Sequence, residues 1–242
     1  MIDLERRKIL VFDLEVAAYD FETHYDEETK EYLTKFAATE QEKLNSIDAL
    51  TFSPFTSQIV CIGLYDLNRD KKCCLINVDE SYEKQPEDEC EEYVFGTEKE
   101  IIEIFWKSVA TYKYDIFVTF NGREFDCPFL MLRSMILGIR PSYNLMKGSD
   151  FTFKDYHVDL LKELTFHKHS PQGARRKFTL DFYCKQLGVQ TSKDGGVTGD
   201  MVGPLFRDKQ YRTIADYCIR DVVTEAELFK KWNELLNFNQ LY

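Results

Sequence analysis

The sequence lacks several features that would each point to a particular class of protein. It has no CxxC pair, and its seven cysteines are scattered along the chain, so neither a disulfide framework nor a zinc site is indicated. No apolar stretch is long enough to cross a membrane, and acidic residues come too early for a signal peptide. There is no internal repeat or low-complexity tract. These absences lead us to expect an intracellular protein of the reducing cytoplasm.

Basic charge is scarce relative to acidic charge. The chain has 31 Lys and Arg residues against 42 Asp and Glu residues, for a net charge of −11. This balance argues against a protein that coats nucleic acid by bulk phosphate neutralisation. A polyanionic substrate would have to be held by a local basic patch or by metal ions. With 242 residues, 44% of them hydrophobic, the chain is expected to form one domain with an ample core.

The hydrophobic pattern predicts strands first and helices later. Short apolar runs predict strands at 9–15, 58–65, 72–78 and 116–120, the second and third as a hairpin. Helical spacing predicts helices at 98–110, 126–137, 158–166, 179–187 and 211–236. The acidic segment 79–92 and segment 138–155 are predicted to be loops. Segment 17–50 is polar, with Tyr32, Leu33, Phe36, Leu44 and Ile47 at roughly helical spacing, and is interpreted as a polar helical insertion.

The first apolar strand ends in a pair of acids, Asp13 and Glu15, within the run Phe12-Asp13-Leu14-Glu15. Side chains alternate along a strand, so both carboxylates would face one side. Taken alone, such a pair is more often a solvated rim than a site.

Two further patterns lie downstream. In the run Asn121-Gly122-Arg123-Glu124-Phe125-Asp126, a strand passes into a helix that begins near Asp126. That acid is either a site residue or a helix cap. In the last predicted helix, Tyr217 and Asp221 are four residues apart and therefore share a face. An isolated pattern of this kind usually means a core tyrosine beside a surface acid.

In combination and in this order, the three patterns resemble the DEDD superfamily of 3′–5′ exonucleases. The tyrosine branch is the match, and the likeness is greatest to the proofreading domain of B-family DNA polymerases. It extends through His157-Val158-Asp159-Leu160 and Phe178-Thr179-Leu180-Asp181 and covers most of the chain from Lys8 to Phe229. The resemblance implies an α/β fold, a ribonuclease-H-like mixed sheet flanked by helices. We therefore expect residues 1–242 to form a single, stand-alone exonuclease domain with its insertion at about 17–50.

The resemblance also implies a catalytic set. Its four acids map onto Asp13, Glu15, Asp126 and Asp221, with Tyr217 orienting the attacking water. Converging carboxylates repel one another unless cations neutralise them, and hard divalent ions prefer oxygen ligands. Two divalent ions, Mg²⁺ or Mn²⁺, are thus expected to act on the scissile phosphate. A sister branch has histidine five residues before the last acid, where this chain has Asp216, so the histidine mechanism is disfavoured.

Substrate contacts are predicted in three places. By resemblance, the backbone of Val16 and Ala17 would meet the terminal nucleotide, and Asn121 and Phe125 would line the path of the next one. For Phe125, core packing is the alternative. A basic stretch holds Arg175, Arg176 and Lys177. These cations would either bind the phosphate backbone of the approaching strand or lie in a solvated loop.

The expected activity is hydrolysis of phosphodiester bonds from a single-stranded 3′ end, with release of nucleoside monophosphates. DNA is preferred because the likeness is to polymerase proofreading domains. An RNA 3′-end trimming exoribonuclease remains open, since the metal chemistry serves both substrates. So does a non-catalytic nucleic-acid-binding module. The 17–50 insertion is the expected surface for a protein partner, or a lid, and no membrane partner is expected.

Overall fold

A six-stranded mixed sheet forms the centre of the protein. The computed structural model describes residues 1–242 except 84–89, 91, 149–154, 192–195 and 239–242. The strands are β1 (Ile9–Ala18), β2 (Ser57–Asp66), β3 (Lys71–Asn77), β4 (Tyr93–Gly96), β5 (Ile116–Thr119) and β6 (His157–Asp159). Their spatial order is β4-β3-β2-β1-β5-β6. The first three are antiparallel, whereas β4, β5 and β6 each pair in parallel with their inner neighbour.

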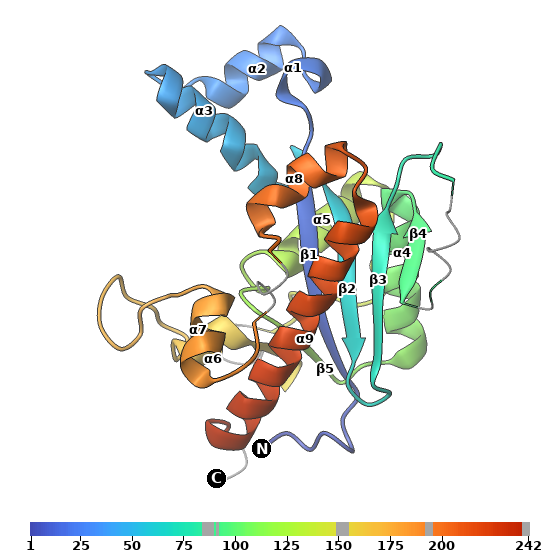
Figure 1. Ribbon diagram of the computed structural model, residues 1–242, viewed down its shortest axis with the longest axis vertical. Helices are drawn as coiled ribbons and strands as arrows, with labels where there is room; N and C mark the ends of the chain where they lie inside the picture. Colours follow the sequence, from blue (N-terminus) through green and yellow to red (C-terminus); the bar gives the residue numbers. More distant parts are fainter. Residues whose placement is uncertain (84–89, 91, 149–154, 192–195, 239–242) are drawn as a thin grey trace.

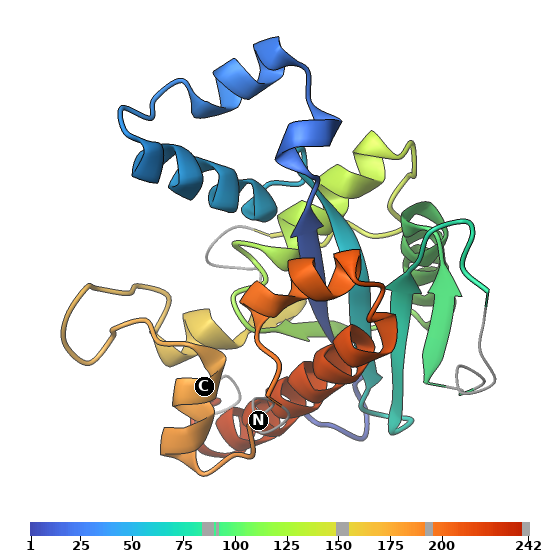
Figure 2. The ribbon, with the colours of Figure 1, turned by 45° about the horizontal axis from the view of Figure 1, so that its top comes forward.

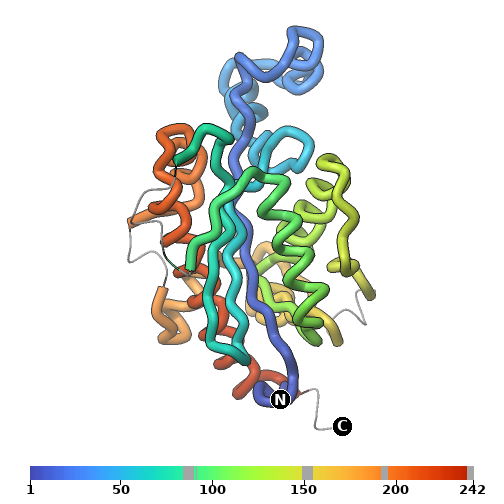
Figure 3. The backbone as a smooth tube through the Cα atoms, turned by 90° about the vertical axis from the view of Figure 1, so that its right-hand side faces the viewer, coloured from blue at the N-terminus to red at the C-terminus, as the bar shows by residue number. Residues whose placement is uncertain are grey.

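Helices cover both faces of this sheet, as predicted. The helices α4 (Glu98–Tyr112) and α5 (Asp126–Ile136) lie on one face, and the long helix α9 (Tyr211–Leu235) crosses the other (Figures 1 and 3). Alternation along β1 supplies both cores, since Phe12 and Leu14 pack on the α4 side and Val11 on the α9 side. The central strand is therefore buried on both faces and leaves its polar residues for the site described below.

The packing of α9 on β2 depends on one glycine. A Cβ atom at Gly63 would lie 2.8 Å from Sγ of Cys218 and 2.9 Å from a methyl of Val222. Any larger residue at this position would push the helix away from the sheet. Gly63 thus allows α9 to pack closely on β2.

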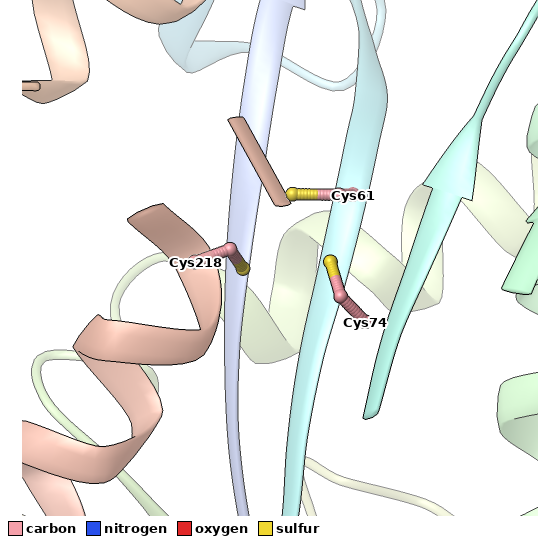
Figure 4. A group of neighbouring side chains, drawn as sticks. All are labelled: Cys61, Cys74 and Cys218. Carbon is pink, nitrogen blue, oxygen red and sulfur yellow. The ribbon is translucent and has the colours of Figure 1, made fainter. Parts of the chain in front are cut away.

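Three cysteines from three elements meet under α9. The sulfur atoms of Cys61, Cys74 and Cys218 all lie within 4.8 Å of one another (Figure 4). Burial raises the pKa of the Cys61 and Cys74 thiols, and a hydrogen bond to Cys61 raises that of Cys218. The thiols are therefore neutral and pack as small apolar side chains. Spacing in the sequence gave no sign of this cluster, because its members are brought together only by the fold.

An arm of short helices connects the end of β1 to the start of β2 (Figure 2). It contains α1 (Phe21–His24), α2 (Glu27–Thr34), α3 (Glu40–Asp48) and the 3₁₀ helix η1 (Ala49–Phe52). Helices were predicted in this segment, and several of its large apolar side chains are exposed. Tyr32, Phe36 and Leu44 are 64%, 88% and 54% exposed, and no side chain is buried in α2 or α3, every residue of which is described. Ala17 also belongs to β1 rather than to this arm.

Several boundaries differ from the prediction. The segment predicted as a helix at 158–166 begins with the edge strand β6 and continues as α6 (Leu160–Leu164), because Val158 pairs with Val118. Two short elements, β4 and α8 (Gly199–Arg207), were not predicted. The predicted helix near 179–187 is α7 (Leu180–Leu187), which ends at Gly188 in the left-handed conformation. The predicted loops 79–92 and 138–155 lie partly outside the described residues.

Among the described residues, no helix combines the length and the apolar character needed to span a membrane.

Candidate active site

The first two acids, Asp13 and Glu15, lie where β1 extends beyond the end of the neighbouring strand β5. Val11 pairs with Val118 of β5, and β5 ends one residue later at Thr119. Asp13 and Glu15 therefore lie beyond the last parallel pair. Both point to the face covered by α9, as alternation predicts, since Phe12 and Leu14 are in the opposite core.

The third acid is brought beside them by the turn after β5. Asn121 has a φ of +67°, and a Cβ at Gly122 would lie 2.2 Å from Oγ1 of Thr119, so this turn requires its glycine. Asp159 holds the turn by accepting hydrogen bonds from the backbone N–H groups of Asn121 and Arg123, each at 3.0 Å. Helix α5 then begins at Asp126.

Asp126 bonds to β1 and is not the N-cap residue of its own helix. It is only 3% exposed, and its Oδ1 accepts a hydrogen bond of 3.1 Å from the backbone N–H of Leu14. The N-cap residue of α5 is Phe125, which makes no side-chain cap. Asp126 is therefore not the N-cap residue, but it lies in the first turn of α5 and its carboxylate also accepts a hydrogen bond from its own backbone N–H. Its role as a site residue stays a prediction.

Helix α9 supplies the tyrosine and the fourth acid. Tyr217 and Asp221 lie one turn apart, and the phenol donates a hydrogen bond to the carboxylate. Burial, followed by the charges of Glu15 and Asp221, raises the pKa of Tyr217 far above its usual value. The hydroxyl therefore stays protonated. Asp216, at the position of the alternative histidine, accepts a hydrogen bond from the hydroxyl of Tyr93.

All five predicted catalytic side chains line one pocket of about 320 Å³. Carboxylate oxygens of Asp13, Glu15 and Asp221 lie within 4.8 Å of one another. The other lining residues come from β1, from the segment after β5, from α7 and its N-cap, and from α8 and α9. They are Leu14, Phe120, Asn121, Phe125, Thr179, Leu180, Asp181, Gly199 and Glu225.

The carboxylates of the pocket repel one another. Burial and then the charge of Asp126 raise the pKa of Asp13, while burial and then Asp221 raise that of Glu15. Burial raises the pKa of Asp126 to about 7, although hydrogen bonds from its own N–H and that of Leu14 oppose the shift. A bound divalent cation would reverse this repulsion. Several hard oxygen donors in reach of one point are the ligand set that Mg²⁺ and Mn²⁺ prefer.

The predicted substrate contacts are only partly brought together. Asn121 and Phe125 line the pocket. Val16 and Ala17 have buried side chains and do not line it, and the predicted contact through their backbone stays a prediction. The basic triplet (Arg175, Arg176 and Lys177) is exposed in a loop and does not line it either. That loop nevertheless leads directly into Thr179 and Leu180, which form part of the wall.

The arm reaches the pocket through an aromatic contact. The rings of Phe52, which is 69% exposed, and Phe125 lie edge to face with centroids 6.3 Å apart. Phe125 also contacts Phe129 of α5, with centroids 5.3 Å apart. Phe125 thus packs against the core and also lines the pocket, whereas its contact with a nucleotide stays a prediction.

Glu225 is a pocket residue that sequence reasoning missed. It is 1% exposed and lies one helical turn after Asp221. Its place in the sequence was an indication, because it shares a face of the helix with Cys218, Val222 and Leu228, all of which are fully buried. An isolated charge on such a face normally has a function or a partner.

Comparison with known proteins connects this site to a family. A family model described as "Predicted 3'-5' exonuclease related to the exonuclease domain of PolB" matches residues 51–236. The DNA polymerase of Orgyia pseudotsugata multicapsid polyhedrosis virus is 24% identical over 238 residues, which cover 89% of this chain and 21% of the polymerase. The catalytic polypeptide of DNA polymerase epsilon from Aspergillus fumigatus is 24% identical over 140 residues, covering 56% of this chain and 6% of that protein.

The fold has a counterpart among solved structures. The family B DNA polymerase of the hyperthermophilic archaeon Pyrobaculum calidifontis superposes with a TM-score of 0.59 at 17% identity. The match covers 93% of this chain and 24% of the polymerase. The mixed sheet flanked by helices is therefore similar to the fold of a segment of a B-family polymerase. The chain spans about a fifth of the length of the viral polymerase that it matches.

Proposed function

The chain belongs to the family of predicted 3′–5′ exonucleases related to the exonuclease domain of PolB, and on this premise we propose a substrate and a mechanism. It hydrolyses phosphodiester bonds from a single-stranded 3′ end and releases nucleoside monophosphates. DNA is preferred over RNA, in keeping with the DNA polymerases among its relatives. The chain acts as one tyrosine-type exonuclease domain that includes the 17–50 arm.

The observation that carries this proposal is the convergence of Asp13, Glu15 and Asp221. Their carboxylate oxygens lie within 4.8 Å of one another, and Asp126 lines the same pocket. These four residues would hold two divalent cations. When bound, such ions polarise a phosphate, activate water and stabilise a leaving oxygen.

The remaining chemistry belongs to the chain itself. Because its pKa is raised, the Tyr217 phenol cannot serve as a base near neutral pH, but it can position water through its hydroxyl. Its hydrogen bond to Asp221 fixes the ring beside the acids. Tyr217 is therefore proposed to orient the attacking water in line with the scissile bond.

The path of the strand is proposed to follow the aromatic and basic residues around the pocket. Phe125 would stack on a base near the 3′ end without reading its identity, with Asn121 beside it. Backbone groups of Val16 and Ala17 would contact the terminal nucleotide. The basic triplet would bind phosphates of the incoming strand and supply local positive charge in a chain of net charge −11.

The arm is proposed to bind a protein partner. Tyr32 and Phe36 are 64% and 88% exposed, and large exposed aromatic side chains are frequent at protein interfaces. Deletion of α2 and α3 should then weaken partner binding while leaving exonuclease activity on short strands intact. Loss of activity on those strands would indicate a lid instead.

The test is a time course on matched 5′-labelled DNA and RNA single strands with Mg²⁺, Mn²⁺ or EDTA. The wild-type protein should produce a metal-dependent ladder that shortens from the 3′ end, faster on DNA. Asp13→Asn and Asp221→Asn should abolish the ladder. Asp216→Asn, an acid of the same helix bonded to Tyr93, should not. Strands that stay intact throughout would reject the catalytic proposal in favour of a binding module, and faster cleavage of RNA would reject the DNA preference.

A further inference from the structure

Glu225 is an acid of the pocket in addition to the four assigned above. Tyr217, Asp221 and Glu225 succeed one another at four-residue intervals in α9, so their side chains share one face of the helix. All three line the pocket that holds Asp13 and Asp126. Glu225 is the most buried of the pocket's acids, at 1% exposed.

One oxygen of this carboxylate is left without a partner. The Glu225 carboxylate accepts a hydrogen bond from the backbone N–H of Phe120. Its Oε2 is buried and has no hydrogen-bond partner within the part of the chain that the structure describes. A buried acceptor without a partner is costly, and native proteins retain few of them.

Another buried acid close by shows the contrast. Asp159 is fully buried, yet it accepts hydrogen bonds from the backbone N–H groups of Asn121, Arg123, Leu161 and Lys162. These hydrogen bonds stabilise the turn after β5 and the start of α6, which explains why Asp159 is buried. Oε2 of Glu225 makes no such hydrogen bond within the described part of the chain. Stabilisation of the fold therefore does not explain the position of that oxygen.

Three acids of the pocket form a compact group, and two others lie outside it. Oxygens of Asp13, Glu15 and Asp221 approach within 4.8 Å, and neither Asp126 nor Glu225 belongs to that group. Both nevertheless line the same pocket. After burial, the charges of Asp126 and Glu225 raise the pKa of Asp13, so both carboxylates act on the same central acid.

We propose that Glu225 supplies, through Oε2, a third protein carboxylate to a second divalent-cation position that it forms with Asp13 and Asp126. The inference rests on the metal-dependent function proposed above. Without Glu225, this position would have two protein carboxylates, and hard cations are held more tightly as charged oxygen ligands are added. The partnerless oxygen is then satisfied by the cation or by water bound to it.

The test compares Glu225→Gln with Glu227→Gln in the full chain. Glutamine keeps an oxygen for the Phe120 N–H and removes the charge. Glu227, two residues along the same helix, has a 51% exposed side chain paired with Lys230 and serves as the matched control. Mn²⁺ binding is measured by calorimetry without nucleic acid, together with the Mn²⁺ dependence of the exonuclease rate.

We expect Glu225→Gln to weaken one of the two Mn²⁺ sites by about tenfold or more, and to raise the Mn²⁺ concentration for half-maximal rate by a similar factor. Glu227→Gln should change neither quantity. The thermal midpoint of metal-free Glu225→Gln should equal or exceed that of the wild type, because a repulsive charge is lost.

The outcomes separate this inference from the function on which it rests. Wild-type affinity at both sites and an unchanged rate curve in Glu225→Gln would overturn the role of Glu225 alone. A wild-type protein that neither binds Mn²⁺ nor needs it for cleavage would overturn the metal-dependent function, and the inference with it.

Discussion

The backbone N–H of Leu14 donates a hydrogen bond of 3.1 Å to Oδ1 of Asp126. This bond joins the central strand to the first residue of α5 and fixes a carboxylate beside Asp13 and Glu15. One side chain thus serves both the fold and the charge of the pocket, and substitutions can separate the two roles.

Replacing Asp126 by Asn keeps an acceptor for Leu14, whereas Ala removes it. Both variants should lose exonuclease activity. Asp126→Ala should be less stable than Asp126→Asn by about 1–3 kcal/mol, because it leaves a buried N–H without a partner. Urea unfolding of the metal-free variants measures the difference. Equal stability of the two would show that the bond to Leu14 contributes nothing to the fold.

The hydroxyl of Tyr217 is expected to act on the rate and not on metal binding. Tyr217→Phe should lower kcat by about 10²-fold, the cost of a poorly positioned reactant, with Mn²⁺ affinity retained. Tyr211→Phe is the control, because Tyr211 lies in the same helix but donates its hydroxyl to Asp79 outside the pocket. A wild-type kcat in Tyr217→Phe would show that the phenol hydroxyl takes no part in the mechanism.

The basic triplet is expected to contribute to binding of the strand. Changing Arg175, Arg176 and Lys177 to Gln should raise KM for single-stranded DNA and leave kcat unchanged. The slope of log affinity against log salt should fall by about 2, given a slope of about 0.7 per phosphate contact on single strands. Lys99, Lys107 and Lys113 are exposed at α4 on the other face of the sheet and provide a control of equal charge. An unchanged salt slope in the triplet variant would show that the loop is solvated and makes no contact with phosphates.

The stability of the metal-free protein should decrease as pH rises. Burial raises the pKa of Asp126 from 3.8 to about 7, so the folded state binds a proton that the unfolded state has already released. This stabilising contribution is complete at low pH and is lost as pH rises through about 7. At 1.36 kcal/mol per pKa unit, the loss is up to about 4 kcal/mol.

Thermal unfolding in EDTA between pH 5 and 8 measures this effect. The midpoint should fall with pH in the wild type and fall less in Asp126→Asn, and saturating Mn²⁺ should restore it at the upper end. A midpoint that rises over this range in EDTA would contradict the repulsion described for the pocket.

Part of the fold and the pocket could be predicted from local patterns. Alternation placed Asp13 and Glu15 on one face of β1, and helical spacing placed Tyr217 beside Asp221. Both rules act over a few residues, so they are visible in sequence. Short elements were not predicted. Strands β4 and β6 have four and three residues, which are too few to show the alternation of apolar and polar residues typical of a strand. Helix α8 was missed because Gly203 and Pro204 in its interior disfavour a helix.

Other features depend on contacts between distant segments. The bond from Leu14 to Asp126 and the meeting of Cys61 with Cys218 depend on how β1, β2 and α9 pack, which no local pattern encodes. Glu225 was visible as an acid among buried apolar neighbours. Its unpartnered oxygen, however, becomes evident only once the hydrogen bonds around it are known.

The most direct test of the central claim is the identity of the first product released from a 3′-labelled single-stranded DNA. The wild-type protein with Mn²⁺ should release labelled nucleoside monophosphate at the earliest times, and Asp13→Asn should release none under the same conditions. If labelled oligonucleotides appeared first, or if Asp13→Asn released the mononucleotide at the wild-type rate, the pocket would not be the site of a 3′–5′ exonuclease.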